Sequence, residues 1–413
     1  MTGARKKLLF ISHRIPWPLN KGEKIRGWHV INHLRAKYDV YLGCVVDDPA
    51  DMAHVEHVGS VCAAVGAYHT QRRQQLLRAV LHVRPGRPLM PDFYHSPDLQ
   101  RWVDLQCERH SFDVIYIYSV AMGRYVLDRR LRGVQTGARF ILDAQDIDSA
   151  KWAEYAEKSE FPKNLFWARE ARTLLAYERH AAAACAQTFF VSQPEAAAFL
   201  KMAPELKGLV CAVECGVDLK KFAPDQVFLS PYRDVVRRLV FTGNMDYWPN
   251  ADAAIWFARE VMPDLRAIHE GIEFWVVGAN PGEEVKSLGD LPGVFITGRV
   301  EDVRPYVMHA DIVVCPLRIA RGIQNKVLEG MAMGKIVIAS PQAFEGVRAI
   351  AGRDLLVADG AEALVAAIGA VIEGGSPDMG QAARTVMENN YAWESVLGAM
   401  DRYLEGAPKG AIG

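Results

Sequence analysis

Hydrophobic residues along this chain form short, nearly continuous runs rich in β-branched residues, and these runs alternate with longer stretches of helical spacing. Such runs are typical of strands buried on both faces of a parallel sheet. Repeated alternation of strands and helices predicts an α/β protein, and two successive series predict two domains of this kind. The predicted strands are 7–12, 39–46, 113–119, 139–142, 187–191 and 209–213, then 238–242, 273–277, 294–297, 311–315, 335–339 and 354–357.

The boundary between the two series is best placed in the segment that contains Gly216, Pro224, Pro231 and scattered charge. We therefore predict a first domain at 1–215 and a linker at 216–237. The second domain is predicted at 238–390, after the linker.

Two helix starts can be predicted from capping residues. The sequence Ser192-Gln193-Pro194-Glu195 has the spacing of a capping box with proline in the first turn, so a helix should begin there. Asn250 is expected to cap a helix that runs through Ile255 and Val261.

Composition then narrows the class of protein. The chain has 413 residues, of which 50% are hydrophobic and 23% charged, and its net charge is -1, so a disordered chain is excluded. Residues 1–215 hold 29 Lys and Arg against 23 Asp and Glu, but no basic stripe interleaved with aromatic residues indicates nucleic-acid binding. Seven cysteines without a Cys-x-x-Cys pair favour neither a disulfide framework nor a zinc site. With no run long enough to span a bilayer, we expect a cytoplasmic protein.

A first candidate site follows the first predicted strand, in the loop 12–24. Gly22 allows close approach of a ligand to the backbone, and Lys21, Lys24 and Arg26 would favour an anion at the helix start. An ordinary surface loop rich in proline and glycine explains the same residues.

A second candidate site follows the strand that ends at Pro316. Gly322 precedes a helix whose first turn holds Asn325 and Lys326, so backbone N–H groups, the helix dipole and a full positive charge combine. Glu329 lies one turn further on the same face, where a carboxylate can accept hydrogen bonds from a ribose diol. The alternative is a simple ion pair between Lys326 and Glu329. We favour a nucleoside-diphosphate site, because a cation in the first turn opposes the helix dipole unless an anion is bound.

The segment 322–339, with sequence GIQNKVLEGMAMGKIVIA, resembles the nucleotide-binding segment of glycosyltransferase family 4, which has the GT-B fold. Three further segments are similar to that family. They are 213–222, which resembles the family's N-G-V-D-x-x-x-F with cysteine in place of the asparagine, then 241–250 and 391–393. The form with Gly-x-x-Asn-Lys before the glutamate resembles sugar transferases of exopolysaccharide loci, including exosortase-associated ones.

The resemblance implies two facing Rossmann-like domains, with the sugar donor held mainly by the second and the acceptor by the first. The last helix, around 392–404, would cross back onto the first domain, which would then include 391–413. Glu329 would bind the ribose, and the diphosphate would meet Lys326 and the backbone of the 322–325 turn. The residues of that turn are Gly322, Ile323, Gln324 and Asn325. Gly22 would lie under the phosphates, and Arg299 and Val300 would border the base.

Three features of the sequence depart from the family pattern. Arg321 replaces a glutamate, Gly243 and Asn244 stand where Arg and Lys are common, and Gln145 replaces a histidine. Arg318 and Arg321 are candidates to supply the missing positive charge. We assign Asp146 as a substrate-contacting carboxylate, and Lys326 and Arg321 as the catalytic cations.

Asp146-Ile147-Asp148 also spells the D-x-D metal motif of the other large glycosyltransferase fold, GT-A. We prefer the interpretation that Asp148 caps a helix, because a GT-A enzyme would need no second Rossmann-like half. No metal and no cofactor are expected apart from the donor substrate.

The sequence thus predicts a glycosyltransferase that moves a sugar from a nucleoside diphosphate to a glycan or lipid-linked acceptor, with retention of configuration by resemblance. A nucleotide-sugar epimerase of the same fold and a non-catalytic GT-B scaffold stay open as alternatives. For the basic, amphipathic stretch 71–87 we favour an ordinary solvated helix, and peripheral contact with the cytoplasmic face of an anionic membrane is the alternative.

Overall fold

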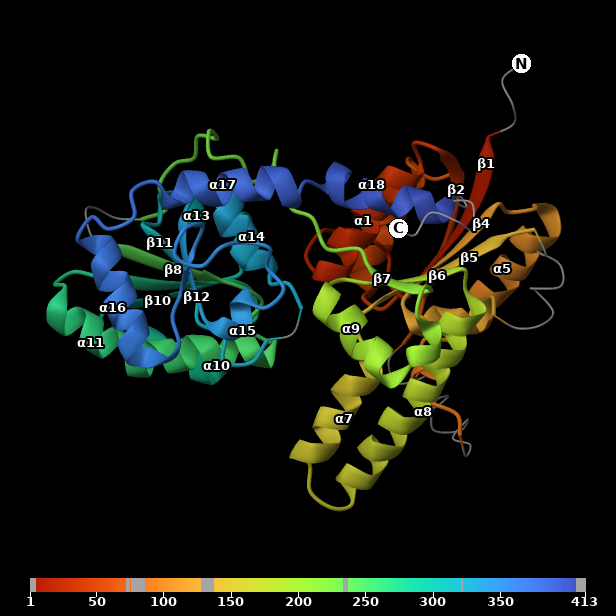
Figure 1. Ribbon diagram of the computed structural model, residues 1–413, viewed down its shortest axis with the longest axis horizontal. Helices are drawn as coiled ribbons and strands as arrows, with labels where there is room; N and C mark the ends of the chain where they lie inside the picture. Colours follow the sequence, from red (N-terminus) through yellow and green to blue (C-terminus); the bar gives the residue numbers. More distant parts are fainter. Residues whose placement is uncertain are drawn as a thin grey trace. The chain divides into compact units, whose positions relative to one another are not determined.

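The computed structural model describes residues 5–71, 75, 86–127, 137–232, 237–320 and 322–405. Arg321 and most of the basic stretch 71–87 therefore lie outside the described residues. The chain divides into two compact units, one of residues 1–214 with 397–413 and one of residues 215–396. Each unit contains one parallel sheet covered by helices (Figure 1), as the α/β pattern predicts.

The first unit is built on a seven-stranded sheet in the order β3-β2-β1-β4-β5-β6-β7. Its strands are β1 (Lys6–Ser12), β2 (Tyr38–Val46), β3 (Ala64–His69), β4 (Val114–Tyr118), β5 (Arg139–Gln145), β6 (Gln187–Phe190) and β7 (Val210–Ala212). Its helices are α1 (Gly22–Leu34), α2 (Val55–Gly59), α4 (Met90–Phe93), α5 (Pro97–Arg109), α7 (Asp148–Lys158), α8 (Lys163–Ala184) and α9 (Gln193–Met202). Sequence reasoning missed β3, because its six residues alternate small and half-buried side chains instead of forming a continuous apolar run.

Both faces of this sheet are covered, which explains the continuous apolar runs. Leu9 and Ile11 of β1 pack in a cluster with residues of α5 and α9. Phe10 stacks on Tyr116 of β4 at 5.0 Å on the opposite face. The hydroxyl of Tyr116 lies 3.4 Å from the sulfur of Met400, in the last helix, α18 (Trp393–Leu404). The end of α18 thus completes the first unit.

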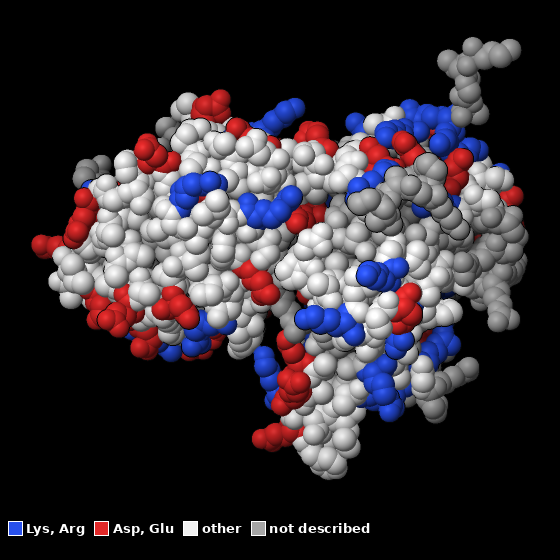
Figure 2. All heavy atoms as spheres, in the orientation of Figure 1, with Lys and Arg blue, Asp and Glu red and all other residues white. Residues whose placement is uncertain are grey.

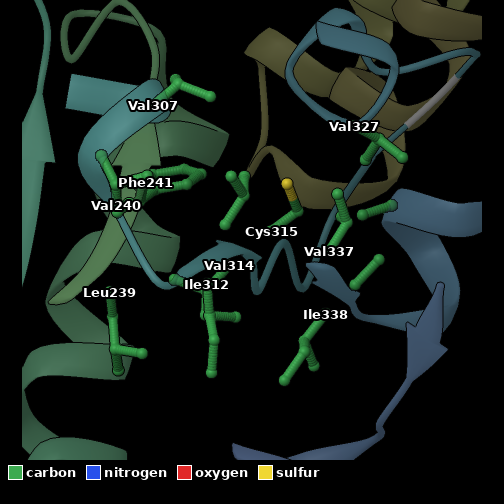
Figure 3. Packing of buried hydrophobic residues seen from close by; sticks show 14 of the residues in the cluster. Leu239, Val240, Phe241, Val307, Ile312, Val314, Cys315, Val327, Val337 and Ile338 are labelled. Atoms are coloured by element: carbon green, nitrogen blue, oxygen red, sulfur yellow. The ribbon is translucent and has the colours of Figure 1, made fainter. Parts of the chain in front are cut away.

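The second unit has a six-stranded sheet in the order β10-β9-β8-β11-β12-β13. Its strands are β8 (Arg238–Thr242), β9 (Glu273–Val277), β10 (Val294–Gly298), β11 (Ile312–Cys315), β12 (Ile336–Ala339) and β13 (Leu356–Val357). Its helices are α10 (Trp248–Trp256), α11 (Met262–Ile268), α12 (Glu283–Lys286), α13 (Arg304–His309), α14 (Asn325–Ala332), α15 (Pro341–Phe344), α16 (Gly360–Ile372) and α17 (Met379–Asn390). Figure 3 shows the core between β8, β11, β12 and α14.

The local capping signals are partly confirmed. Helix α9 begins at Gln193, and the Ser192 hydroxyl accepts a hydrogen bond from the backbone N–H of Glu195, as the capping box predicts. Asn250 is not a cap, because α10 begins two residues earlier and the Asn250 amide donates to the carbonyl of Asn244 at 2.9 Å. Asp148 lies in the first turn of α7 and makes no capping hydrogen bond; the N-cap residue is Ile147.

Candidate functional site

The strand order of the second sheet reverses direction between β8 and β11. From β8 the chain moves outward through β9 and β10, then returns to pair β11 with the other side of β8. In open parallel sheets, loops at the carboxyl ends of the two strands beside such a reversal diverge and leave a ligand crevice. The two loops here are 243–247 and 316–324.

Helix α14 starts in this crevice. Gln324 is its N-cap residue, in extended conformation, and Gly322 has φ of 64°, a left-handed conformation that favours glycine. The backbone N–H groups of Asn325 and Lys326 donate to no acceptor in the described part of the chain. Uncapped donors and the positive end of the helix dipole at this entrance therefore fit an anion.

The Lys326 side chain is half-buried, and its ammonium lies over the ring of Phe241 at 5.6 Å from the ring centre. Phe241 belongs to β8 and Cys315 ends β11, and in the view of Figure 3 the Cys315 side chain lies between Phe241 and Val327 of α14. Burial lowers the pKa of Lys326, which means that the surrounding protein does not compensate its charge fully. Among the described residues, no carboxylate forms an ion pair with this ammonium.

Glu329 lies one turn further along α14 and is half-buried. Burial raises its pKa to about 7, against the opposing effects of Lys221 and Lys326. No ion pair joins Glu329 to Lys326, so the alternative of a simple i,i+3 pair is not formed in this structure. The carboxylate also accepts no hydrogen bond from the residues that the structure describes.

Two residues of this region escaped sequence reasoning. Lys221 acts on the pKa of Glu329 more strongly than Lys326 does, although it lies in the segment assigned as a linker. Phe241 forms the apolar floor under Lys326. Phe241 could be recognised only as a buried strand residue, and no local pattern marks Lys221.

The loop after β8 is held by side-chain amides. Asn244 accepts a hydrogen bond through its side chain from Asn280 at 3.4 Å. A Cβ on Gly243 would lie 2.7 Å from the Asn250 amide, so a larger residue there would displace the Asn250 side chain. Arg318 forms an ion pair with Asp252 of α10, which partly neutralises the charge that it was expected to supply to a ligand.

The other predicted residues of this unit are dispersed. Ile323 packs against the core at the start of α14, and the Gln324 amide donates to the carbonyl of Gly322. Arg299 is exposed and Val300 half-buried, just after β10, which is the edge strand two places from β8. The position of Arg321 lies outside the described residues.

The first sheet has its own reversal, between β1 and β4, and α1 starts there at Gly22. The structure corrects the expectation that Lys24 attracts an anion. Lys24 points into the interior and forms a buried ion pair with Asp51 at 2.5 Å. Arg26 likewise pairs with the buried Asp143 at 3.1 Å. The sequence cannot reveal these partners, because they come from other elements.

His13, immediately after β1, also lies at this reversal. Its ring stacks against Tyr118 and meets the edge of Tyr94. Burial lowers the pKa of the imidazole to about 4, so it is neutral at physiological pH. Its Nδ1 atom is buried and has no hydrogen-bond partner among the described residues.

Asp146 follows β5 at the same edge of the first sheet. Its carboxylate binds the Lys151 ammonium at 2.8 Å, and Asp148 binds the same ammonium at 3.4 Å. The two carboxylates of the D-x-D sequence therefore hold a lysine of their own helix. In the described ranges, no group of three or more His, Cys, Asp or Glu is arranged to hold a metal ion.

Comparison with solved structures identifies the architecture. Sucrose-phosphate synthase from Thermosynechococcus elongatus aligns over 97% of this chain and 98% of its own, with TM-score 0.70 and 17% identity. The fold is GT-B. HepE of Anabaena, in complex with UDP and glucose, aligns over 97% and 100% of the two chains with TM-score 0.64 and 14% identity. An E. coli structure described as trehalose-6-phosphate bound with UDP-2-fluoro glucose aligns over 97% and 99%, with TM-score 0.63 and 13% identity.

At the level of sequence, residues 236–374 match the family described as glycosyl transferases group 1. This range contains the α14 site with Lys326 and Glu329, so the matched domain is the half of the GT-B fold in which the unpaired charges lie. Among curated proteins, none matches the chain. No helix within the described ranges is long and apolar enough to cross a membrane.

Proposed function

We propose that this protein is a glycosyltransferase that transfers a sugar from a nucleoside-diphosphate donor to a glycan or lipid-linked acceptor, with the donor bound at the entrance of α14. The proposal places it in exopolysaccharide synthesis, as a family 4 enzyme that retains anomeric configuration. Support comes from the group 1 match of residues 236–374 and from structurally similar proteins that were solved with UDP and glucose or with UDP-2-fluoro glucose bound.

One observation carries the proposal: Lys326 and Glu329 lie one turn apart at the strand reversal, and they do not pair with each other. A protein that merely used these charges for stability would pair them, because a half-buried charge without a partner is costly. A donor provides both partners, a diphosphate for Lys326 and a ribose diol for Glu329.

The chemistry follows from charge. As the glycosidic bond to the diphosphate breaks, negative charge grows on the leaving oxygen. The fixed N–H groups of Asn325 and Lys326 and the ammonium of Lys326 would stabilise it without reorganisation. Arg321 would add a second cation. With these groups in place, we propose that no metal ion is required.

On the acceptor side, the proposed residues lie at the edge of the first sheet. Asp146 would contact the substrate, and Gly22 would lie under the donor phosphates. The neutral imidazole of His13, which is half-buried at the same edge, would border the bound acceptor. Membrane contact through the stretch 71–87 remains part of the proposal for a lipid-linked acceptor.

The decisive experiment is calorimetric titration of the purified full chain with UDP, GDP and ADP, each with and without magnesium. We expect one of the three to bind, and its affinity to be independent of magnesium. The variants Lys326→Met and Glu329→Gln should weaken that binding.

Lys335→Met is the matched control, because Lys335 is also a lysine of this unit whose pKa burial lowers. It lies between the C-terminal end of α14 and the start of β12, so it is remote from the entrance of α14. An equal loss of nucleotide affinity in this control variant would contradict the assignment of Lys326 and Glu329. Binding without transfer to any acceptor would favour a scaffold, and epimerisation of the donor sugar without an acceptor would identify an epimerase.

A further inference from the structure

The α7–α8 hairpin is a feature of the first unit that the proposed donor site does not use. Helix α7 packs against α8 through Trp152 and Trp167, whose rings stack at 4.9 Å. Helix α8 has 22 residues, about 33 Å at 1.5 Å per residue. Only its second half is buried against the unit, so the turn of the hairpin projects beyond the sheet (Figure 1).

Large apolar side chains gather at the projecting end. Phe161 is 78% exposed, Leu165 60%, Tyr155 53% and Phe166 41%. Exposure of this size is common for a single apolar residue, but four such side chains within twelve positions form a patch. In Figure 2 the end of the hairpin is mostly white, with charged atoms nearer the body of the unit.

The side chains are ordered along the axis of the hairpin. The exposed apolar residues lie at the end, together with the exposed charges of residues 157, 158, 160 and 163, and the half-buried pair Trp152 and Trp167 follows. The exposed Arg172 comes six residues after Phe166, about 9 Å further along α8. In a bilayer, apolar side chains partition to the acyl region, tryptophans to the interface and long cationic side chains to the phosphates. The apolar residues, the tryptophan pair and Arg172 follow one another in this order along the hairpin.

We propose that the α7–α8 hairpin is a docking element that inserts its end, residues 155–167, into the interfacial region of a lipid bilayer. A protein partner would need a groove matched to this convex end, whereas a fluid bilayer accommodates any convex apolar surface. Insertion is shallow, because Glu157 and Glu160 are exposed beside the patch and must stay in water. These acids also offset Lys158 and Lys163, so the apolar side chains supply most of the binding.

The test is co-flotation of the full chain with vesicles of phosphatidylcholine alone and of phosphatidylcholine with phosphatidylglycerol. We expect binding to both, and a loss of at least about tenfold in partitioning for the double variant Phe161→Ser/Leu165→Ser, since it removes the two most exposed apolar side chains of the patch, whose burial drives binding. The matched control is Val227→Ser/Leu229→Ser, which removes two apolar side chains that are 96% and 94% exposed in the second unit.

Unchanged flotation of the hairpin variant, or an equal loss in the control, would overturn the proposal. The proposal would also be overturned if the wild-type chain bound neither kind of vesicle. Sedimentation would then show whether the patch joins two copies of the chain or whether the chain is a monomer. Thermal melting verifies that both variants fold. Nucleotide titration of the hairpin variant should match the wild type, so failure of the donor site and failure of membrane docking are separate outcomes.

Discussion

The charged side chains at the carboxyl ends of the strands are paired in the first sheet, whereas Lys326 and Glu329 at the entrance of α14 in the second sheet are not paired with each other. At the edge of the first sheet, lysines and arginines have carboxylate partners from the chain itself: Lys24 with Asp51, Arg26 with Asp143 and Lys151 with Asp146. At the edge of the second sheet, Lys326 and Glu329 lie one turn apart without an ion pair. Both edges contain a strand reversal and a helix entrance, so topology alone does not distinguish them.

The difference separates charges that stabilise the fold from charges kept for a ligand. A buried pair is satisfied within the protein, and removal of one partner leaves an uncompensated charge. An unpaired charge lowers the stability of the protein without ligand, and binding of an oppositely charged ligand offsets this loss. Removing a charge at the edge of the first sheet should therefore lower the stability of the protein, whereas removing Lys326 or Glu329 should weaken ligand binding and leave stability unchanged or higher.

The largest effect is expected at the buried pair of the first unit. Asp143→Ala should destabilise that unit by about 3–5 kcal/mol, because the variant leaves Arg26 buried without its carboxylate. Denaturant unfolding monitored by circular dichroism, with hydrogen exchange of β5, measures the loss. A transition midpoint equal to that of the wild type would show that the pair is not structural.

Lys326→Met should reduce kcat about 100-fold, the scale expected for loss of one group that stabilises transition-state charge. Its stability should equal or exceed that of the wild type, because a half-buried cation is removed. Steady-state transfer assays test the predicted loss of kcat, and thermal melting of the same sample tests the predicted stability. A variant with a lower melting temperature than the wild type and unchanged turnover would show that Lys326 stabilises the fold and does not act on a ligand.

Glu329→Gln should weaken nucleotide binding about tenfold or more at pH 8, since hydrogen bonds to a charged acceptor contribute about 1.5–3 kcal/mol. Because the free carboxyl has a pKa of about 7, wild-type affinity should rise with pH up to and just above that value. Below pH 6 the wild-type group is protonated, so the two proteins should converge. Calorimetry from pH 6 to 8.5 provides the comparison, and parallel pH curves would refute the role of Glu329.

The smallest effect is expected for Asp146→Asn. Its pair with Lys151 is partly exposed, so stability should change by about 1 kcal/mol or less. If Asp146 contacts the substrate as proposed, turnover should still fall clearly. Normal turnover together with normal stability would remove Asp146 from the site and leave it as a surface partner of Lys151.

Sequence reasoning succeeded where a function depends on neighbours along the chain. The spacing of Lys326 and Glu329 follows from helix geometry, and the two α/β domains follow from the alternation of strands and helices. The GT-B fold was implied by the resemblance of segments such as 322–339 to a known family. It failed for Lys24 and Arg26, whose partners are 27 and 117 residues away. Lys221 was missed for the same reason, because its effect on Glu329 depends on how a distant segment folds back onto α14.

The contact between the loops after β8 and β9 limits how the specificity of this site can be redesigned. A side chain on Gly278 would place its Cβ 1.7 Å from the carbonyl oxygen of Gly243, so any larger residue at position 278 would separate the two loops. Libraries meant to change donor preference should keep both glycines and vary Asn244, Asp246 and Asn280, whose side chains form the hydrogen-bonded rim above that contact.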